Sequence, residues 1–175
     1  IDLSGGWNWT GLLYLYIDPS NSQRLYYTGT TGGLFVTENA GKSWKRQSDS
    51  CLAITALAID PRNPLHLYAA TFEHPVDSDC RFVAGVYESH NGGQSWKLLT
   101  PPEMATPPDE WAGDYWHLAI DPHDFNVIYA GGNEQTFASL DGGKTWNKVL
   151  NRGCSMLITH PQNGILYCGL WDSLA

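Results

Sequence analysis

The chain has few charged residues and no long hydrophobic run. Charged residues make up 16% of its 175 positions, below the roughly 25% of an average soluble domain. No apolar stretch approaches the ~20 residues that a membrane-spanning helix needs, and apolar residues seldom recur at helical spacing. The sequence therefore excludes a transmembrane helix within its length and disfavours a helical bundle.

Basic residues are scarce and scattered. The chain has ten Lys and Arg against eighteen Asp and Glu, giving a formal net charge of −8. Proteins that bind nucleic acid or anionic membranes usually cluster their basic residues on one surface. We therefore expect no nucleic-acid partner and no membrane insertion. Residue 1 does not open a signal peptide, so any export signal would lie outside this sequence.

The four cysteines show no Cys-x-x-Cys spacing, which disfavours zinc and haem attachment. Cys154 and Cys168 fall on consecutive predicted strands whose ends antiparallel pairing would bring together. A disulfide there is one interpretation, and a second could link Cys51 to Cys80. The alternative is that these residues are small buried thiols. Low charge and an aromatic content of 13% suit a compact extracellular or luminal β domain, so we expect a secreted protein.

One short pattern occurs three times, at residues 37–44, 89–96 and 139–146. Each copy reads hydroxyl, any residue, Asn or Asp, any residue, Gly, any residue, hydroxyl, Trp. The tryptophans lie 52 and 50 residues apart, which is typical of four-stranded propeller blades rather than of helical-hairpin repeats. The repeated residues are Asn39, Gly41 and Trp44, Asn91, Gly93 and Trp96, and Asp141, Gly143 and Trp146.

These residue types suit a tight hairpin. An Asn or Asp side chain accepts hydrogen bonds from nearby backbone amides, a Gly supplies positive φ, and flanking hydroxyls tie the two strands together. The Trp begins the last strand and can cover the open edge of a blade. We therefore predict that the repeated positions are structural rather than catalytic.

A second pattern, Ile-Asp-Pro, precedes each copy of the first and is followed by another apolar run. A weaker fourth copy lies at residues 158–161. Asp before Pro favours turn initiation, so we predict turn-forming rather than catalytic roles. The aspartates concerned are Asp18, Asp60 and Asp121.

Together the patterns predict an all-β fold, a β-propeller with blades of four antiparallel strands. We expect residues 1–175 to form a single partial propeller domain of about three and a half blades. The second strands of the first two blades are predicted at 24–29 and 66–71. The predicted blades are 11–50, 51–100, 114–150 and 153–175.

Three and a half blades do not close a ring, because strand 164–170 would present an unpaired apolar edge. We favour a fragment of a longer propeller. Two alternatives stay open: residues 1–9 could return to complete the last blade, or another copy of the chain could supply the missing strands.

The two patterns resemble the Asp-box, or bacterial neuraminidase repeat, whose hairpin joins the third and fourth strands of a blade. Their spacing is more specifically similar to xyloglucan-active glycoside hydrolases, sortilin-type receptors and photosystem assembly-factor propellers. In those hydrolases a catalytic aspartate precedes a Gly-Gly-aromatic stretch, and Thr31 stands at the matching position here. The resemblance therefore implies the fold, whereas hydrolysis by this chain alone is not expected and its catalytic residues stay unknown.

Two predicted connections on one face, 72–81 and 100–117, are much longer than the others, and long loops are usually functional. Both combine acids with aromatic or other polar residues, a composition that suits sugar binding. The alternative is that Trp111 and Trp116 only pin the loop to its blade. The predicted ligand-binding residues are Glu73, Asp77, Asp79, Arg81, Trp111, Asp114, Tyr115 and Trp116.

No cofactor is expected, although residues 77–79 offer oxygen ligands of the kind that calcium prefers. A solvated acidic loop is the alternative for this segment. Two functions remain for the chain: a carbohydrate-recognition module of an extracellular glycan-active protein, or a non-enzymatic protein-interaction, assembly or surface-filament module. The expected partner is accordingly a glycan or protein ligand, with further propeller strands from the same protein or another copy.

Overall fold

The computed structural model describes residues 13–29, 33–48, 52–71, 84–101, 117–132 and 135–170. Within these ranges the chain is built of β-strands and contains no helix, so none is present there that could cross a membrane. Three sheets have four strands each and a fourth sheet has two. Every strand pair is antiparallel. The predicted fold class, a partial β-propeller of about three and a half blades, is confirmed.

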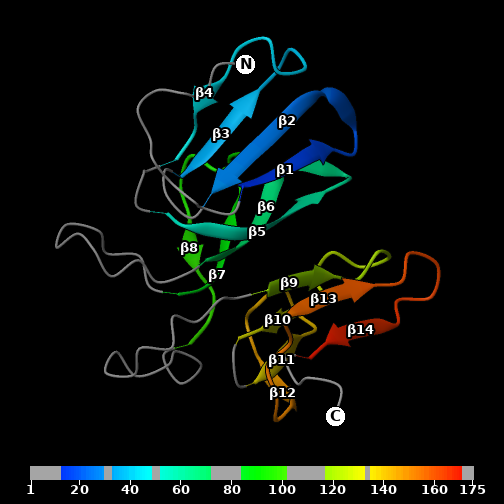
Figure 1. Cartoon of the computed structure of the whole chain (residues 1–175). Coiled ribbons are helices and arrows are strands. Elements are labelled where there is room, and N and C mark those ends of the chain that lie inside the picture. The colour runs from blue at the N-terminus through cyan, green and yellow to red at the C-terminus, as the bar shows by residue number, and fades with distance from the viewer. Residues whose placement is uncertain are drawn as a thin grey trace, which may run out of the picture.

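Each sheet follows the chain order of its strands (Figure 1). Blade one contains β1 (Leu13–Asp18), β2 (Asn21–Gly29), β3 (Leu34–Thr37) and β4 (Lys45–Arg46). Blade two contains β5 (Ile54–Asp60), β6 (Asn63–Thr71), β7 (Gly85–Ser89) and β8 (Lys97–Leu98). Blade three contains β9 (His117–Ile120), β10 (Ile128–Gly131), β11 (Thr136–Ser139) and β12 (Asn147–Leu150). The half-blade contains β13 (Met156–Thr159) and β14 (Leu166–Gly169).

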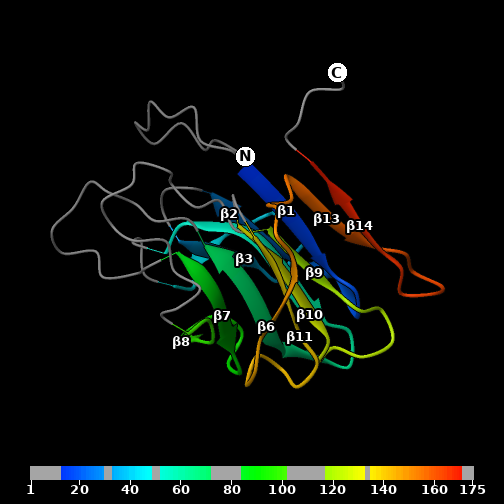
Figure 2. The same ribbon diagram turned by 90° about the horizontal axis from the view of Figure 1, so that it is seen from below.

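The first strands of successive blades contact one another in chain order, β1 with β5, β5 with β9 and β9 with β13. Figure 2 shows the sheets from below, with β13 and β14 beyond β9. This sequence of contacts is the arc expected when blades radiate from a common centre, with the first strand of each blade innermost.

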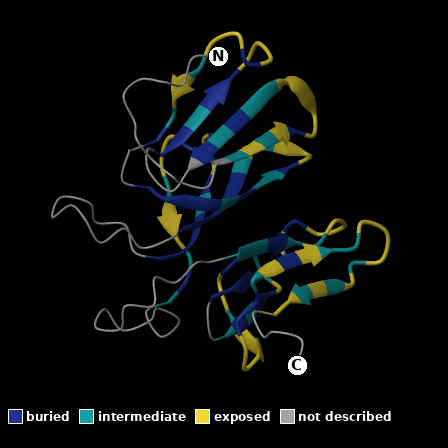
Figure 3. Cartoon of the chain, viewed as in Figure 1, coloured by how far each residue is buried: buried dark blue, intermediate teal, exposed yellow. Residues whose placement is uncertain are grey.

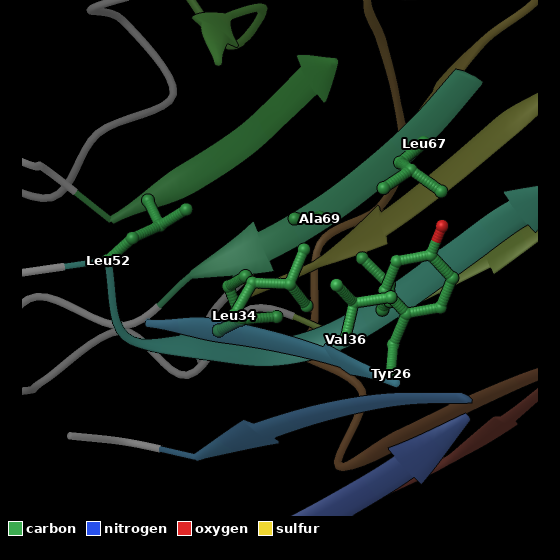
Figure 4. Packing of buried hydrophobic residues seen from close by; sticks show 8 residues of the cluster. Tyr26, Leu34, Val36, Leu52, Leu67 and Ala69 are labelled. Carbon is green, nitrogen blue, oxygen red and sulfur yellow. The ribbon is translucent and has the colours of Figure 1, made fainter. Parts of the chain in front are cut away.

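The hydrophobic core lies between the blades. Tyr26 and Leu34 of blade one meet Leu67 of blade two in one buried cluster (Figure 4). Tyr68 of blade two packs with Ile128 of blade three in another. Because side chains alternate along a strand, Leu67 and Tyr68 point to opposite neighbours, and each full blade is a layer with two apolar faces.

Two strand boundaries differ from the prediction. The second strands begin at Asn21 and Asn63, three residues early, because Asp18 pairs with Asn21 and Asp60 pairs with Asn63. Only two residues therefore separate these paired positions, and the hairpins are tighter than the sequence pattern indicates. In the outer strands the paired segment starts one residue after the Trp in each blade, so the Trp precedes the strand instead of beginning it.

Exposed residues lie along the strands at the two ends of the arc (Figure 3), and several of them are apolar. On β1, Leu15 and Ile17 are each 61% exposed, and on β13, Met156 and Ile158 are 56% and 53% exposed. The residue matching Leu15 in blade two, Leu57, is only 7% exposed because it packs into the cluster shared with blade one. The exposed faces thus correspond to positions that a neighbouring blade covers elsewhere in the arc.

The half-blade is closed by a disulfide between Cys154 and Cys168, whose Cα atoms lie 5.4 Å apart. The disulfide interpretation is confirmed for this pair. Cys154 is fully buried and packs with Leu157 against blade three. Cys51 and Cys80 lie outside the described residues.

Candidate functional site

The blades share one polarity. We call the end of the sheets at Gly29, Thr71 and Gly131 the upper end, and the end at the Ile-Asp-Pro turns the lower end. Ala70 near the upper end of blade two packs with Ala130 near the upper end of blade three. Tyr68 and Ile128, one step lower, pack together in the same way. The upper ends of neighbouring blades therefore lie side by side.

Both long connections are attached at the upper end. The first leaves β6 after Thr71 and returns before Gly85, with which Thr71 is paired. The second begins after Pro101, beyond the end of the outer strand β8 of blade two, and enters blade three before His117, the partner of Gly131. The predicted placement of the two connections on one face agrees with these attachment points.

The predicted ligand-binding residues lie outside the described residues, so their mutual geometry is not part of the structure. Thr31, at the position of the catalytic aspartate in the resembling hydrolases, also lies outside them. The residues that stay predictions are Glu73, Asp77, Asp79, Arg81, Trp111, Asp114, Tyr115 and Trp116.

The residues at the two ends of the first connection are closely packed. The Thr71 hydroxyl donates to the Gly85 carbonyl at 3.2 Å and accepts from the Gly85 amide at 3.1 Å. A Cβ atom at Gly85 would collide with the hydroxyl of Thr100, and that hydroxyl accepts a hydrogen bond from Val86 N at 3.4 Å. The upper end of blade two is thus a fixed platform at which the connection begins and ends.

His117 stands at the foot of the second connection, on the innermost strand of blade three. Burial lowers the pKa of its imidazole, which leaves the ring neutral at pH 7. Its Nε2 atom is buried and has no hydrogen-bond partner among the described residues. Sequence reasoning missed this side chain as a candidate, since a single His at a strand start gives no pattern.

The lower end carries the three box hairpins, which we define as residues 37–44, 89–96 and 139–146. In each, the Asn or Asp oxygen accepts from the backbone amide four residues on, at 2.9 Å in all three. The first hydroxyl of each accepts from the Gly amide four residues on, at 3.0, 2.9 and 2.8 Å. The predicted hairpin chemistry is therefore present in every copy.

The glycines of the box hairpins have the positive φ that the pattern predicts. Gly41, Gly93 and Gly143 have φ of 84°, 89° and 81°. A Cβ on Gly93 would collide with Leu34 of blade one, and a Cβ on Gly143 would lie 2.6 Å from Leu99 of blade two. The second and third box hairpins therefore also pack closely against the blade before them, which supports a structural role.

Two of the three tryptophans of the box hairpins, Trp96 and Trp146, occupy equivalent positions between blades. Trp96 packs against the core between blades one and two, and its Nε1 donates to the Gly93 carbonyl at 3.0 Å. Trp146 packs against the core between blades two and three and donates to the Gly143 carbonyl at 3.2 Å. Trp44 lies edge-on to Tyr27, with ring centroids 6.2 Å apart.

The Ile-Asp-Pro aspartates form turns, as predicted. Asp18 accepts from Ser20 N at 2.7 Å, Asp60 from Arg62 N at 2.9 Å and Asp121 from His123 N at 2.8 Å. Burial alone would raise the pKa of Asp60, but hydrogen bonds from Arg62 N and His66 outweigh it and leave the pKa below its usual range.

Sequence reasoning also missed a cluster at the lower end of blade two, formed by His66, Glu88 and His90. Their donor atoms all lie within 4.8 Å of one another. Aligning the repeats would have given a signal, because Arg24 and Glu38 occupy the positions of His66 and His90 in blade one. The cluster lies at the opposite end of the blade from the two long connections.

No protein-family model matches the chain. By sequence it is 28% identical over 162 residues to a xyloglucanase of Hypocrea jecorina, covering 85% of this chain and 18% of that protein. It is 25% identical over 197 residues to a probable oligoxyloglucan-reducing end-specific xyloglucanase of Neosartorya fischeri, covering 94% of this chain and 23% of that protein. The chain thus spans about a fifth of the length of these curated relatives.

Solved structures give the same fold. An ancestral GH74 enzyme superposes with a TM-score of 0.68 at 20% identity, over 89% of this chain and 21% of the enzyme. An auxiliary nutrient binding protein from Bacteroides thetaiotaomicron gives 0.63 at 15% identity, over 90% of this chain and 35% of that one. YCF48 bound to D1 peptide gives 0.52 at 13% identity, over 85% and 48%. The chain is therefore a partial β-propeller similar to xyloglucanase and YCF48 propellers, as the sequence patterns predict.

Proposed function

We propose that this chain is part of an extracellular Asp-box β-propeller that recognises carbohydrate, and that its box hairpins are Asp-boxes. The observation that carries the proposal is the placement of both long connections at the upper end of propeller blades similar to those of xyloglucanases. Propeller chemistry resides in the loops rather than in the sheets, and long loops in compact domains are usually functional.

The ligand class that fits best is a β-glucan chain with side branches, of the xyloglucan type. Trp111, Tyr115 and Trp116 would offer ring faces to sugar rings, while Glu73 and Asp114 would accept hydrogen bonds from hydroxyls. His117 at the foot of the second connection adds a neutral ring whose buried Nε2 has no partner among the described residues. We propose recognition rather than hydrolysis, because Thr31 replaces the carboxylate that the resembling hydrolases use.

Binding of xyloglucan oligosaccharides tests the proposal, measured by isothermal titration calorimetry with cello-oligosaccharides as a comparison. We expect Trp111→Ala and Trp116→Ala to weaken binding at least tenfold, since loss of one stacking platform removes a large apolar contact. Lys148→Ala, on the exposed outer strand of blade three, is the matched control. Circular dichroism checks that each variant keeps its fold. Unchanged binding in both Trp variants would refute the assignment of the site.

The exposed faces at the two ends of the arc favour a second role, in assembly. Leu15 and Ile17 at one end and Met156 and Ile158 at the other are all more than half exposed, and exposed apolar sheet faces attract partners. We propose that further propeller strands, from the same protein or another copy, pack there. Multi-angle light scattering of the chain with and without Ile158→Asp would show whether this face drives self-association.

A further inference from the structure

We propose that His66, Glu88 and His90 bind a divalent transition-metal ion, with Zn²⁺ as the best-fitting ion and Asp60 as a positioning residue. This site is separate from the proposed carbohydrate site. The carbohydrate site depends on connections at the upper end, whereas these side chains lie at the lower end of blade two. The two proposals therefore stand or fall independently.

The strand register brings the three ligands together. Tyr68 of β6 pairs with Glu88 of β7, so His66 and Glu88 emerge on the same face, two residues apart along the blade. His90 is the second residue of the box hairpin and directly follows β7. The His66 and Glu88 side chains are each only 13% exposed, whereas that of His90 is 68% exposed. His66 and Glu88 are thus held within the blade, whereas His90 lies on the solvent-exposed side of the proposed site.

The two distances from Glu88 to the imidazoles are compatible with one shared ion. Glu88 Oε1 lies 3.0 Å from His66 Nε2 and 3.2 Å from His90 Nε2. Two ligand atoms bound at about 2.0–2.2 Å to a tetrahedral Zn²⁺ lie about 3.3–3.5 Å apart. The His66 and His90 rings are stacked, with centroids 4.6 Å apart and planes 18° from parallel. The exposed His90 ring would turn so that both Nε2 lone pairs point at the same ion.

A neutral His66 cannot donate a hydrogen bond to both of the carboxylates that face its ring. Asp60 Oδ2 faces His66 Nδ1 at 3.4 Å, and a neutral imidazole has one N–H to donate. If that N–H points to Asp60, His66 Nε2 carries a lone pair and faces the carboxylate of Glu88. A metal ion bound to His66 Nε2 and Glu88 converts this acceptor–acceptor contact into two coordinate bonds.

Asp60 supplies the outer-shell contact that metal-binding histidines usually have. Ligating His residues commonly donate their second N–H to a carboxylate, which fixes the ring and its tautomer. Asp60 is itself held by Arg62 N at 2.9 Å. Phe125 and Tyr68 contact the His66 ring edge-on at 5.1 and 4.9 Å. The ring is therefore oriented before an ion arrives.

The repeats show that the fold does not need this cluster. In blade one the matching positions hold Arg24, which binds Glu38 at 2.9 Å and Asp18 at 3.3 Å. In blade three they hold Val127 and Leu140. The same two positions thus hold an ion pair in blade one, a His pair in blade two and an apolar pair in blade three. Hairpin geometry alone therefore does not account for His66 and His90.

Two nitrogen ligands and one carboxylate suit divalent transition-metal ions, among them Zn²⁺, which accepts both ligand types and keeps a fourth position for water in open sites. A hard cation such as Mg²⁺ or Ca²⁺ would prefer oxygen ligands alone. The chemistry of the ligands therefore points to an ion such as Zn²⁺, and Mg²⁺ serves as a negative control.

The test is a Zn²⁺ titration of EDTA-treated chain without a histidine tag, in competition with a chromogenic chelator. We expect one ion per chain at the cluster, and at least tenfold weaker binding in His90→Ala, an exposed position where the repeats tolerate Glu and Leu. His123→Ala is the matched control, because His123 is exposed and lies outside the cluster. Equal affinity in the wild type and in His90→Ala would overturn the proposal.

A second variant tests the role of Asp60. Asp60→Asn keeps a side-chain oxygen for the turn but loses the charge that faces His66, so we expect roughly ten- to a hundredfold weaker Zn²⁺ binding with an unchanged circular dichroism spectrum. Zn²⁺ should also raise the melting temperature of the wild type and not of His90→Ala. A melting temperature that Mg²⁺ raises equally, or that Zn²⁺ leaves unchanged in the wild type, would contradict a specific site.

Discussion

Blade one and blade two are built from the same pattern but lie in different surroundings. Leu15 and Leu57 occupy matching positions on their first strands, yet Leu15 is 61% exposed and Leu57 is 7% exposed. Leu57 faces blade one, whereas no described residue packs in the same way on the matching face of blade one. The apolar pattern of a strand therefore specifies which side chains can be buried, and contact with a neighbouring blade determines whether they are.

The lower ends of the two blades differ in chemistry rather than in burial. Asp18 and Asp60 form the same turn, but the partner above Asp18 is a permanent cation, Arg24, and the partner above Asp60 is His66. An arginine side chain stays protonated and cannot bind a metal, whereas a histidine can. One scaffold position thus serves as an ion-pair clip in blade one and as a proposed metal ligand in blade two.

The largest change in stability is expected for substitutions at the matching leucines of the first strands. Leu57→Ala should lower the free energy of unfolding by about 3 kcal/mol, because it removes a buried side chain from a packed core. Leu15→Ala should lower it by less than about 1 kcal/mol, because the side chain is mostly in solvent. Urea unfolding followed by tryptophan fluorescence measures both. Equal losses would mean that Leu15 is covered in solution.

A smaller effect is expected in the box hairpins. Ala40 in the first hairpin has φ of 54°, where the second and third hairpins have Gly92 and Gly142. The left-handed region is strained for Ala and open to Gly, so Ala40→Gly should raise the free energy of unfolding by about 0.5 kcal/mol. Gly92→Ala should lower it by about 1 kcal/mol for the same reason. Thermal denaturation of the two variants, which should shift in opposite directions, checks this.

The ion pair of blade one can be placed at the matching positions of blade two to test whether it replaces the His pair. The double variant His66→Arg with His90→Glu should keep a free energy of unfolding within about 1 kcal/mol of the wild type, because partly exposed ion pairs contribute little. It should also bind Zn²⁺ no better than His90→Ala. Stability is measured by urea unfolding and Zn²⁺ binding by chelator competition. Retained Zn²⁺ affinity would place the ion elsewhere.

The smallest effect concerns the one box hairpin that has Asp in place of Asn. Hydrogen bonds from the Thr145 side chain and backbone, and from Ser139, lower the pKa of Asp141 to about 2. A carboxylate whose folded pKa is depressed stabilises the fold above its ordinary pKa of about 4, and this contribution is lost as the pH falls to about 2. Asp141→Asn should therefore unfold slightly more easily at pH 7, with the difference vanishing near pH 2.

Urea unfolding at several pH values between 2 and 7, wild type beside Asp141→Asn, measures this difference. Asn39→Asp is the reciprocal variant and should gain the same pH dependence, because the first hairpin offers the same amide of Ser43. A difference between wild type and Asp141→Asn that stays constant with pH would show that the charge of Asp141 is not what stabilises the third hairpin.

Much of the fold could be predicted from local chemistry. The box hairpins depend on residues within eight positions of one another, and the Ile-Asp-Pro turns on bonds between residues two apart. Such short-range patterns are visible in the sequence. The disulfide between Cys154 and Cys168 depends on more than local chemistry, because it requires the register of two strands as well as their existence.

The candidate sites were less predictable. His66 and Glu88 are 22 residues apart and meet only because β6 and β7 pair in one register. His117 gains interest only from the burial of its Nε2 atom. Residues such as Trp111 and Trp116 were chosen by composition, and their role as sugar platforms stays a prediction.

Local sequence dictates the repeat, the hairpins that close each blade, and the alternation that gives the inner strands two apolar faces. These depend on hydrogen bonds and φ values within a few residues. Contacts between blades settle which faces are covered, which blade packs against Gly93, and which side chains gather beside Asp60. Those outcomes depend on strand register and on the packing of one blade against the next, and such long-range contacts leave no short pattern in the chain.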